Sequence, residues 1–324
     1  MKKLAVLFLS ALLVFGLAAC GGSGGGGDKT IKVGVAIYRF DDNFMTLYRE
    51  ELEKYFNDLS KGGVKYDVTI VDGQFNQDTQ TGQIDNFISQ QVDVIIVNLV
   101  QNSAAATIVN KCKEAEIPVV LINREPENAD DMQIWPGKQA YVGADAKVSG
   151  TIQGKIIADL PDKGDLNANG KVDYIMIIGD PDNSDARFRT EFSIKALTDA
   201  GIEVNMLGEK VCNWQATEAQ PAVADFLSKF PNKQIDVVFC NNDGMAMGAL
   251  ASIEAAGLEV GKDIYLVGVD AIPEAVDAVK AGKMTGTVLN DHIGQSHKAA
   301  DVAIELANGK DVETYYWVDY VAVN

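Results

Sequence analysis

The feature that most constrains the fold is a double alternation of short apolar runs with helix-length amphipathic segments along the 324-residue chain. In the first half, apolar runs typical of strands lie at 31–38, 67–72, 92–98 and 117–123. In the second half, similar runs lie at 172–179, 203–207, 235–240 and 264–270. Strands that alternate with helices pair in parallel through right-handed crossovers. We therefore predict an α/β protein of two doubly wound, Rossmann-like lobes.

The two halves also share short sequence matches, such as QVDVI at 91–95 and QIDVV at 234–238. From Thr285 onward, a strand, a helix and a further strand are expected to return to the lobes. We predict that 30–117 with 292–317 forms an N-terminal lobe, and that 118–291 with 318–324 forms a C-terminal lobe. Three crossings would then make the hinge. A cleft between two such lobes favours a small-molecule site.

The first 29 residues are predicted to direct and tether the protein rather than to fold with it. Two lysines precede an apolar stretch, and LAACG at 17–21 is typical of a bacterial lipobox. We therefore expect 1–19 to be a signal peptide, Cys20 to carry a lipid, and 20–29 to be a lipidated, Gly-rich tether. The alternative is a plain secretory signal with an incidental cysteine. Both place the protein outside the cytoplasm, and the lipid anchor would hold it at the membrane.

Charge and motif content exclude several function classes. The net charge of −18 argues against a nucleic-acid partner, because phosphate binding needs clustered Lys and Arg. No GxSxG, HExxH, P-loop or GxGxxG motif occurs, so no enzyme is predicted. Three further cysteines, Cys112, Cys212 and Cys240, have no metal-type spacing and are expected to be buried apolar residues.

Polar side chains stand where several predicted strands end. The strand at 235–240 runs directly into Asn241, Asn242 and Asp243. Ligands of open α/β sheets lie outside the carboxyl ends of the strands, which makes these residues candidate ligand contacts. The alternative is a turn followed by a helix N-cap, because Asn and Asp also cap helices. Other residues of this kind lie at or after strand ends: Asp41, Asp42, Asn98, Asp185, Arg189, Asp270 and Asn290.

This set of residue types suits a sugar. Carboxylates, amides and a guanidinium form paired hydrogen bonds with adjacent hydroxyls, which both donate and accept. Two aromatic residues, Phe44 and Trp214, lie near the same strand ends and could stack on the C–H faces of a pyranose. Paired carboxylates would also be compatible with a sugar-modifying hydrolase, a glycosidase, although no acid and base stand out. A transcription regulator of this fold would need an N-terminal helix-turn-helix, where this chain has a signal peptide.

Seven segments carry a family resemblance that covers nearly the whole chain after Thr30. The chain resembles the galactose/glucose-binding proteins of bacterial ABC sugar transporters, which belong to the type I periplasmic-binding-protein family. The segments are IYRFDDNFM (37–45), VNLVQNSAAA (97–106), VVLINREP (119–126), YVGADAKVSG (141–150), NNDGMAMGA (241–249), GVDAIPEA (268–275) and GTVLND (286–291).

The resemblance implies a hexose ligand, galactose or glucose, and an ABC transporter permease as partner. It implies that Phe44 and Trp214 sandwich the sugar ring. It further implies polar contacts from Asp42, Asn98, Asn183, Asp185, Arg189, Asn242, Asp270 and Asn290. The family has histidine at the position of Asn183, which makes the preferred sugar an open choice. A monomer is expected, and service as a chemoreceptor ligand is a further role that the resemblance implies.

A second candidate site follows from oxygen spacing. Residues 165–173, DLNANGKVD, place side-chain oxygens at positions 1, 3, 5 and 9 and glycine at position 6, the pattern of an EF-hand loop. Position 12 is Met176 rather than glutamate, and the resemblance implies that Asp236 replaces it. The predicted ligands of a structural calcium ion are Asp165, Asn167, Asn169, the Lys171 carbonyl, Asp173 and Asp236. The alternative is a polar turn without metal.

Overall fold

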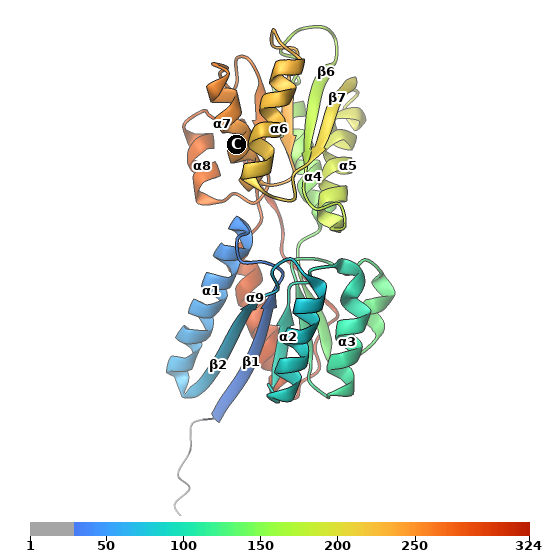
Figure 1. Cartoon of the computed structure of the whole chain (residues 1–324), viewed down its shortest axis with the longest axis vertical. Helices are drawn as coiled ribbons and strands as arrows, with labels where there is room; N and C mark the ends of the chain where they lie inside the picture. Colours follow the sequence, from blue (N-terminus) through green and yellow to red (C-terminus); the bar gives the residue numbers. More distant parts are fainter. Residues whose placement is uncertain (1–28) are drawn as a thin grey trace, which may run out of the picture.

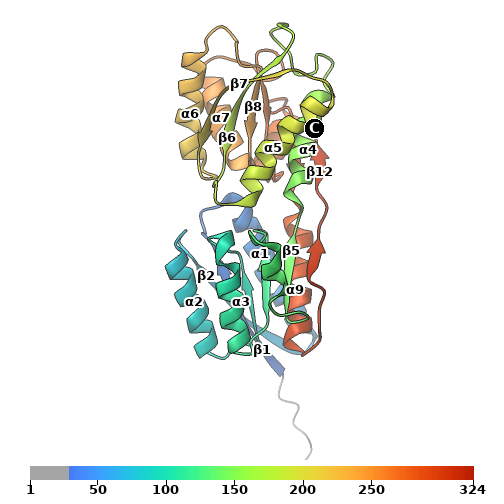
Figure 2. The same cartoon turned by 90° about the vertical axis from the view of Figure 1, so that its right-hand side faces the viewer.

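The computed structural model describes residues 29–324, which form two α/β lobes stacked end to end (Figure 1). The predicted signal peptide, Cys20 and the tether up to residue 28 lie outside the described residues. Within the described part, no helix is both long and apolar enough to cross a membrane. The chain crosses between the lobes three times, along one side of the molecule (Figure 2).

The N-terminal lobe is built on a six-stranded parallel sheet with the order β11-β5-β4-β3-β1-β2. Its strands are β1 (Lys29–Ile37), β2 (Val64–Asp72), β3 (Val94–Val97), β4 (Val119–Ile122), β5 (Gln139–Gly143) and β11 (Tyr315–Trp317). The central strands β3 and β4 read VIIV and VVLI and are buried throughout, because helices cover both faces of a parallel sheet.

Four helices cover this sheet, two on each face. Helices α1 (Asn43–Leu59) and α9 (His292–Ala307) pack on one face, and α2 (Gln77–Ser89) and α3 (Ala105–Glu114) pack on the other. In α1, buried residues recur at helical spacing, which gives the helix one apolar face: Phe44, Met45, Tyr48, Leu52 and Phe56. Short 3-10 turns lie at η1 (Ser60–Gly62), η2 (Asn102–Ala104) and η3 (Ala129–Gln133).

The C-terminal lobe has a four-stranded parallel sheet with the order β7-β6-β8-β9. Its strands are β6 (Val172–Ile178), β7 (Val204–Val211), β8 (Val237–Cys240) and β9 (Tyr265–Val267). A short antiparallel pair, β10 (Thr287–Leu289) with β12 (Val321–Val323), lies beside β9 through isolated bridges. One face is covered by α4 (Ala146–Ala158) and α5 (Ser184–Asp199), and the other by α6 (Ala216–Lys229), α7 (Asp243–Ala255) and α8 (Pro273–Lys280).

The predicted lobe boundary at residues 117 and 118 is wrong. Strand β4 pairs with β3, and β5 pairs with β4, so both belong to the N-terminal sheet. The chain leaves the first lobe only after Gly143 and enters α4 at Ala146. A short apolar strand such as VVLI fits the middle of either sheet equally well, so its sequence carries no mark of the lobe to which it belongs. The later crossings lie between β10 and α9 and between β11 and β12.

The loops after β2 and β7 occupy equivalent places in the two lobes and share one backbone conformation. In each loop two consecutive residues that are not glycine have a left-handed φ: 55° and 53° at Gln74 and Phe75, 45° and 68° at Asn213 and Trp214. The same hydrogen bonds hold both loops, from Gly73 and Cys212 to the end of the neighbouring strand, and from Asn76 and Gln215 back to Gly73 and Cys212. The equivalence makes Phe75 the counterpart of Trp214.

Candidate ligand-binding site

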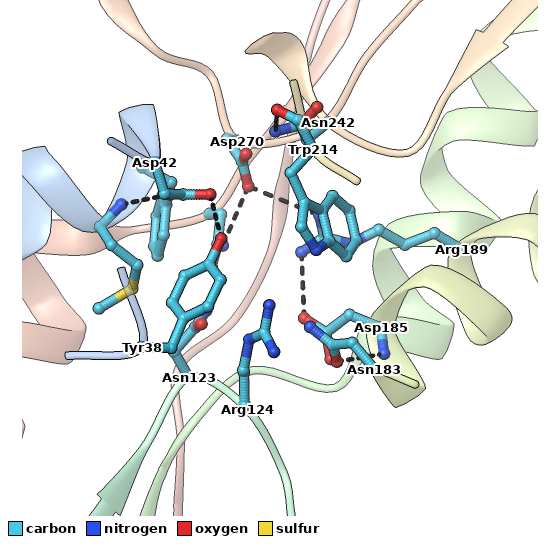
Figure 3. A pocket seen from close by; sticks show the side chains of 13 residues that line it. Tyr38, Asp42, Asn123, Arg124, Asn183, Asp185, Arg189, Trp214, Asn242 and Asp270 are labelled. Atoms are coloured by element: carbon cyan, nitrogen blue, oxygen red, sulfur yellow. Dashed lines mark hydrogen bonds and ion pairs between the residues drawn. The ribbon is translucent and has the colours of Figure 1, made fainter. Parts of the chain in front are cut away.

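A cavity lies between the lobes, at the carboxyl ends of both parallel sheets (Figure 3). In this position the loops after the strands of both lobes can reach one ligand. Figure 3 shows polar side chains converging on it from both lobes. Its lining consists of Tyr38, Asp42, Phe44, Met45, Asn123, Arg124, Asn183, Asp185, Arg189, Trp214, Asn242, Asp270 and Asn290.

The N-terminal lobe contributes a carboxylate and an aromatic ring from the start of α1. Asp42 is the N-cap of this helix, and its Oδ1 accepts the Met45 amide proton at 2.7 Å. Its Oδ2 accepts the Tyr38 hydroxyl, also at 2.7 Å. Both oxygens are therefore held in place before any ligand arrives. Phe44, in the first turn of the same helix, lines the cavity and is almost fully buried.

The C-terminal lobe contributes an ion network around Arg189. Its Nη2 lies 3.3 Å from Asp185 Oδ2 and donates to the Tyr320 hydroxyl at 3.2 Å, while Nη1 lies 3.7 Å from Asp270 Oδ1. Burial alone would lower the pKa of Arg189, but the charges of Tyr320, Asp270 and Asp185 outweigh it and raise the pKa above its usual value. The guanidinium is therefore a fixed cation in the cavity wall.

Burial raises the pKa of the two carboxyl groups beside this cation. The pKa of Asp270 is raised well above its usual value by burial, against the opposing charge of Arg189. Burial also raises the pKa of Asp185, and Arg189 and Arg124 oppose the shift. Asn290 donates from Nδ2 to Asp270 Oδ1 at 3.2 Å. These carboxyl groups lie in a buried wall of low polarity, where a hydrogen bond from a bound molecule is especially favourable.

Two amide side chains in the cavity are fixed as helix N-caps. Asn183 Oδ1 accepts the Asp185 amide proton at 3.0 Å at the start of α5. Asn242 Oδ1 accepts the Met245 amide proton at 2.9 Å at the start of α7. The N-cap interpretation offered from the sequence and the ligand-contact interpretation are thus compatible, because one amide can cap a helix and line a cavity.

Buried donors in the cavity wall lack partners within the described part of the chain. They are Trp214 Nε1, Arg189 Nε and Arg124 Nη2. An unpaired buried donor is unfavourable unless a ligand or water satisfies it. A molecule rich in hydroxyl groups can accept these bonds and donate to the neighbouring carboxylates.

One predicted contact, Asn98, does not line the cavity. Asn98 is fully buried, and its Nδ2 donates at 3.1 Å to both the Ile122 carbonyl and Asn123 Oδ1. It lies behind Asn123, and its hydrogen bond to Asn123 Oδ1 orients that side chain. The other nine predicted sugar contacts do line the cavity.

Four lining residues were not predicted from the sequence: Tyr38, Met45, Asn123 and Arg124. Asn123 and Arg124 directly follow β4, so the strand-end rule that selected Asn98 and Asn242 would also have selected them. Tyr38 and Met45 carry no comparable signal, because each reads as part of an apolar run.

Comparison with known proteins decides the family. The model of the periplasmic binding protein domain matches residues 33–311. The chain belongs to the periplasmic binding protein family. It is 38% identical, over 96% of its length and 90% of the relative's, to the D-galactose/methyl-galactoside binding periplasmic protein MglB of Haemophilus influenzae. It is 28% identical to the ribose import binding protein RbsB of Bacillus subtilis, over 97% of the chain and 96% of the relative.

A solved structure of the same family confirms the predicted type I fold. It is an ABC transporter solute binding protein from Bacillus halodurans with bound myo-inositol, with a TM-score of 0.78 and 28% identity. The match covers 92% of this chain and 96% of that one. The resemblance to periplasmic sugar-binding proteins predicted from seven sequence segments is thereby confirmed.

In this periplasmic binding protein, the loop at 165–173 has a compact fold at the opposite end of the C-terminal sheet from the cavity. Asp165 accepts amide protons from Asn169 at 3.0 Å and Gly170 at 2.9 Å. Gly170, with φ 93°, and Ala168, with φ 57°, turn the chain sharply. Met176, at position 12, is buried in β6 and cannot supply a ligand.

Asp236, just before β8, lies against this loop. It is fully buried and accepts the amide protons of Asn167 at 3.0 Å and Asp173 at 2.8 Å. Burial, together with the charges of Asp173 and Asp165, raises the pKa of Asp236 to about 6, against the backbone hydrogen bonds that it accepts. A cation would relieve this repulsion, so the donor chemistry fits calcium.

The charged residues around the loop do not form a metal site by themselves. Residues 29–324 contain no cluster of three or more His, Cys, Asp or Glu side chains placed to hold a metal ion. The amides of Asn167 and Asn169 donate to Asp173 Oδ2, at 3.3 and 2.7 Å. A calcium ion would have to be bound by the side-chain oxygens of both asparagines. Their side-chain amides would therefore have to rotate so that Oδ1, rather than Nδ2, points to the ion.

Proposed function

We propose that this protein binds a monosaccharide, D-galactose or D-glucose, between its lobes and delivers it to the permease of an ABC transporter. The observation that carries the proposal is the combination of unpaired buried donors, buried carboxylates and two aromatic rings in one interlobe cavity. Sugar hydroxyls satisfy both kinds of polar group, and the faces of a pyranose match the rings of Phe44 and Trp214.

The choice of a hexose is supported by the relative that binds D-galactose and methyl-galactoside, which shares 38% of its residues. The ribose import protein and the structure with bound myo-inositol each share 28%. Isothermal titration against galactose, glucose, ribose and myo-inositol tests the choice. We expect the two hexoses to bind at least about tenfold tighter than ribose, because ribose lacks groups for some of the buried partners. Tighter binding of ribose or myo-inositol would contradict the hexose assignment.

Binding rather than hydrolysis is the expected outcome of sugar capture. Asp185 and Asp270 are both engaged with the Arg189 cation, which leaves neither as an obvious general acid. Incubation with nitrophenyl galactoside and glucoside should release no nitrophenol above the rate in buffer. Release that is lost in an Asp185→Asn variant would instead support the glycosidase alternative.

The lipid anchor at Cys20 is part of the proposal. It places the sugar-binding lobes at the extracytoplasmic face of the membrane, within reach of a permease. Growth with a radiolabelled fatty acid should label the parent protein, and Cys20→Ser should abolish labelling and release the protein from the membrane fraction. Equal labelling of both proteins would exclude Cys20 as the attachment site.

We also propose a structural calcium ion in the loop at 165–173, closed by Asp236. The side chains that would hold it are Asp165, Asn167, Asn169, Asp173 and Asp236, together with the Lys171 carbonyl. The ion would neutralise carboxylates that lie close together and would stiffen the start of β6 and β8. It would stay remote from the sugar, because Asp236 precedes β8 and Asn242 follows it.

A further inference from the structure

Within residues 29–324, three pairs of side chains form hydrogen bonds or ion pairs between the lobes across the cleft. Arg124 Nη1 lies 3.2 Å from Asp180 Oδ2, Arg187 Nη2 donates to Glu127 Oε2 at 2.9 Å, and Asn102 Nδ2 donates to Ser184 Oγ at 3.2 Å. The first member of the Arg124–Asp180 pair follows β4 of the N-terminal lobe, and the second follows β6 of the C-terminal lobe. Such contacts exist only while the lobes are closed.

The Arg124–Asp180 pair differs from the Arg187–Glu127 pair in burial. Its side chains are 1% and 7% exposed, whereas both side chains of the Arg187–Glu127 pair are 45% exposed. An exposed ion pair contributes little, because water screens it. A buried pair is close to neutral when intact, but a buried charge that has lost its partner is strongly unfavourable.

Arg124 is also fixed in the cavity wall. Its Nη1 donates to the Val100 carbonyl at 2.8 Å, and its guanidinium carbon lies 3.7 Å from the centre of the Tyr38 ring. Its Nη2 is buried without a partner in the described chain, and Figure 3 shows the guanidinium among the cavity side chains. One nitrogen of Arg124 is thus held from the opposite lobe, while the other is free for a ligand oxygen.

We propose that Asp180 is a positioning residue that couples lobe closure to the presentation of Arg124 to the bound ligand. In the open form Asp180 is far from Arg124 and water solvates both charges. Closure replaces that water with the ion pair and leaves Nη2 directed at the ligand. A ligand that accepts from Nη2 then stabilises the closed form more than a ligand that does not. The inference rests on the proposed function, since it needs a ligand with oxygen acceptors.

The test is a double-mutant cycle on sugar affinity, with radius of gyration from small-angle scattering as a second measurement. Asp180→Asn leaves a buried unpaired guanidinium, and Arg124→Gln leaves a buried unpaired carboxylate. We expect each to weaken binding of the preferred hexose by at least about 30-fold. We expect the double variant to lose much less than the product of the two factors, because no charge is left unpaired. At equal sugar occupancy, both single variants should be less compact than the parent.

Arg187→Gln is the matched control, because it removes an interlobe pair that water screens. It should change affinity by less than about threefold. The melting temperatures of the ligand-free variants show whether they are folded. If Asp180→Asn fails to fold, the sugar affinities of Arg124→Gln and the double variant can still be compared.

Two results would overturn the coupling. One is an Asp180→Asn variant that binds and compacts like the parent, and the other is a double variant whose loss equals the product of the single losses. Both results presuppose that the parent protein binds sugar, so neither of them contradicts the proposed function. A parent that binds no sugar or cyclitol overturns the proposed function, and this inference with it.

Discussion

The guanidinium carbon of Arg189 lies 5.7 Å from the centre of the Trp214 ring, although the two side chains come from different elements. Arg189 belongs to α5 and Trp214 to the loop after β7. The guanidinium lies over the indole ring, and the Trp214 Nε1 donor has no partner in the described chain. The ring is therefore held rigidly with one polar atom left for a ligand, as a stacking surface requires.

Replacing Trp214 should remove most of the sugar affinity. We expect Trp214→Ala to lose about 2–4 kcal/mol of binding free energy, as for other buried aromatic residues at binding sites. Calorimetry measures the loss. Trp317→Ala is the matched control, because Trp317 is about half exposed at the sheet edge and should leave affinity unchanged. Unaltered hexose binding by Trp214→Ala would mean that this cavity is not the sugar site.

Asn98→Ala should reduce stability as well as affinity. The substitution leaves the Ile122 carbonyl and Asn123 Oδ1 without their buried donor, which costs about 1–3 kcal/mol of unfolding free energy. Asn123→Gly should weaken binding with a smaller effect on stability, because Asn123 lines the cavity and glycine adopts its left-handed φ of 59° without strain. Denaturant titration and calorimetry separate the two effects. The assignment of Asn98 as a supporting residue fails if Asn98→Ala lowers affinity while stability is unchanged.

The unfolding free energy should carry a pH-dependent contribution from Asp243. Burial raises the pKa of Asp243 to about 7, against hydrogen bonds from Thr287 and Ile272. The folded state therefore binds this proton more tightly than the unfolded state does, so the contribution stabilises at low pH and is lost as the pH rises toward 7. Between pH 5 and pH 8 we expect the loss to be about 2–3 kcal/mol.

Asp243→Asn should remove this contribution. Other buried carboxyl groups, such as Asp270, also titrate, so the informative quantity is the parent curve minus the variant curve measured by urea unfolding at several pH values. That difference should decline as the pH rises. A flat difference curve would show that Asp243 has the same pKa in the folded and unfolded states.

Calcium should raise the melting temperature of the parent, and a chelator should lower it, because an ion that binds only the native state stabilises it by mass action. Asp236→Ala should abolish the response and leave sugar affinity within about threefold, since the loop is remote from the cavity. Scanning calorimetry with and without chelator makes the measurement. The calcium proposal is falsified if a fully chelated parent melts at the same temperature as the calcium-loaded one.

The sequence alone predicted most of the cavity, because its polar residues sit at strand ends and the strand pattern is clear. The prediction failed where a residue's role depends on how deeply it is buried rather than on its position in the sequence. Asn98 and Asn123 both follow short apolar strands, but only packing in three dimensions places one behind the other. The lobe boundary failed for a related reason, since β4 pairs with β3 through backbone hydrogen bonds that no side chain specifies.

The matched loops after β2 and β7 have a practical consequence for anyone altering this protein. Trp214 is 7% exposed in the cavity, while its counterpart Phe75 is 42% exposed and contacts only Tyr38 and Arg39 among aromatic and cationic partners in the described chain. The loop therefore keeps its shape in the first lobe without a cavity contact from its aromatic side chain. A fluorophore attached at position 75 would be carried by the first lobe, next to Tyr38 in the cavity wall. It would report sugar binding without replacing a residue that lines the cavity.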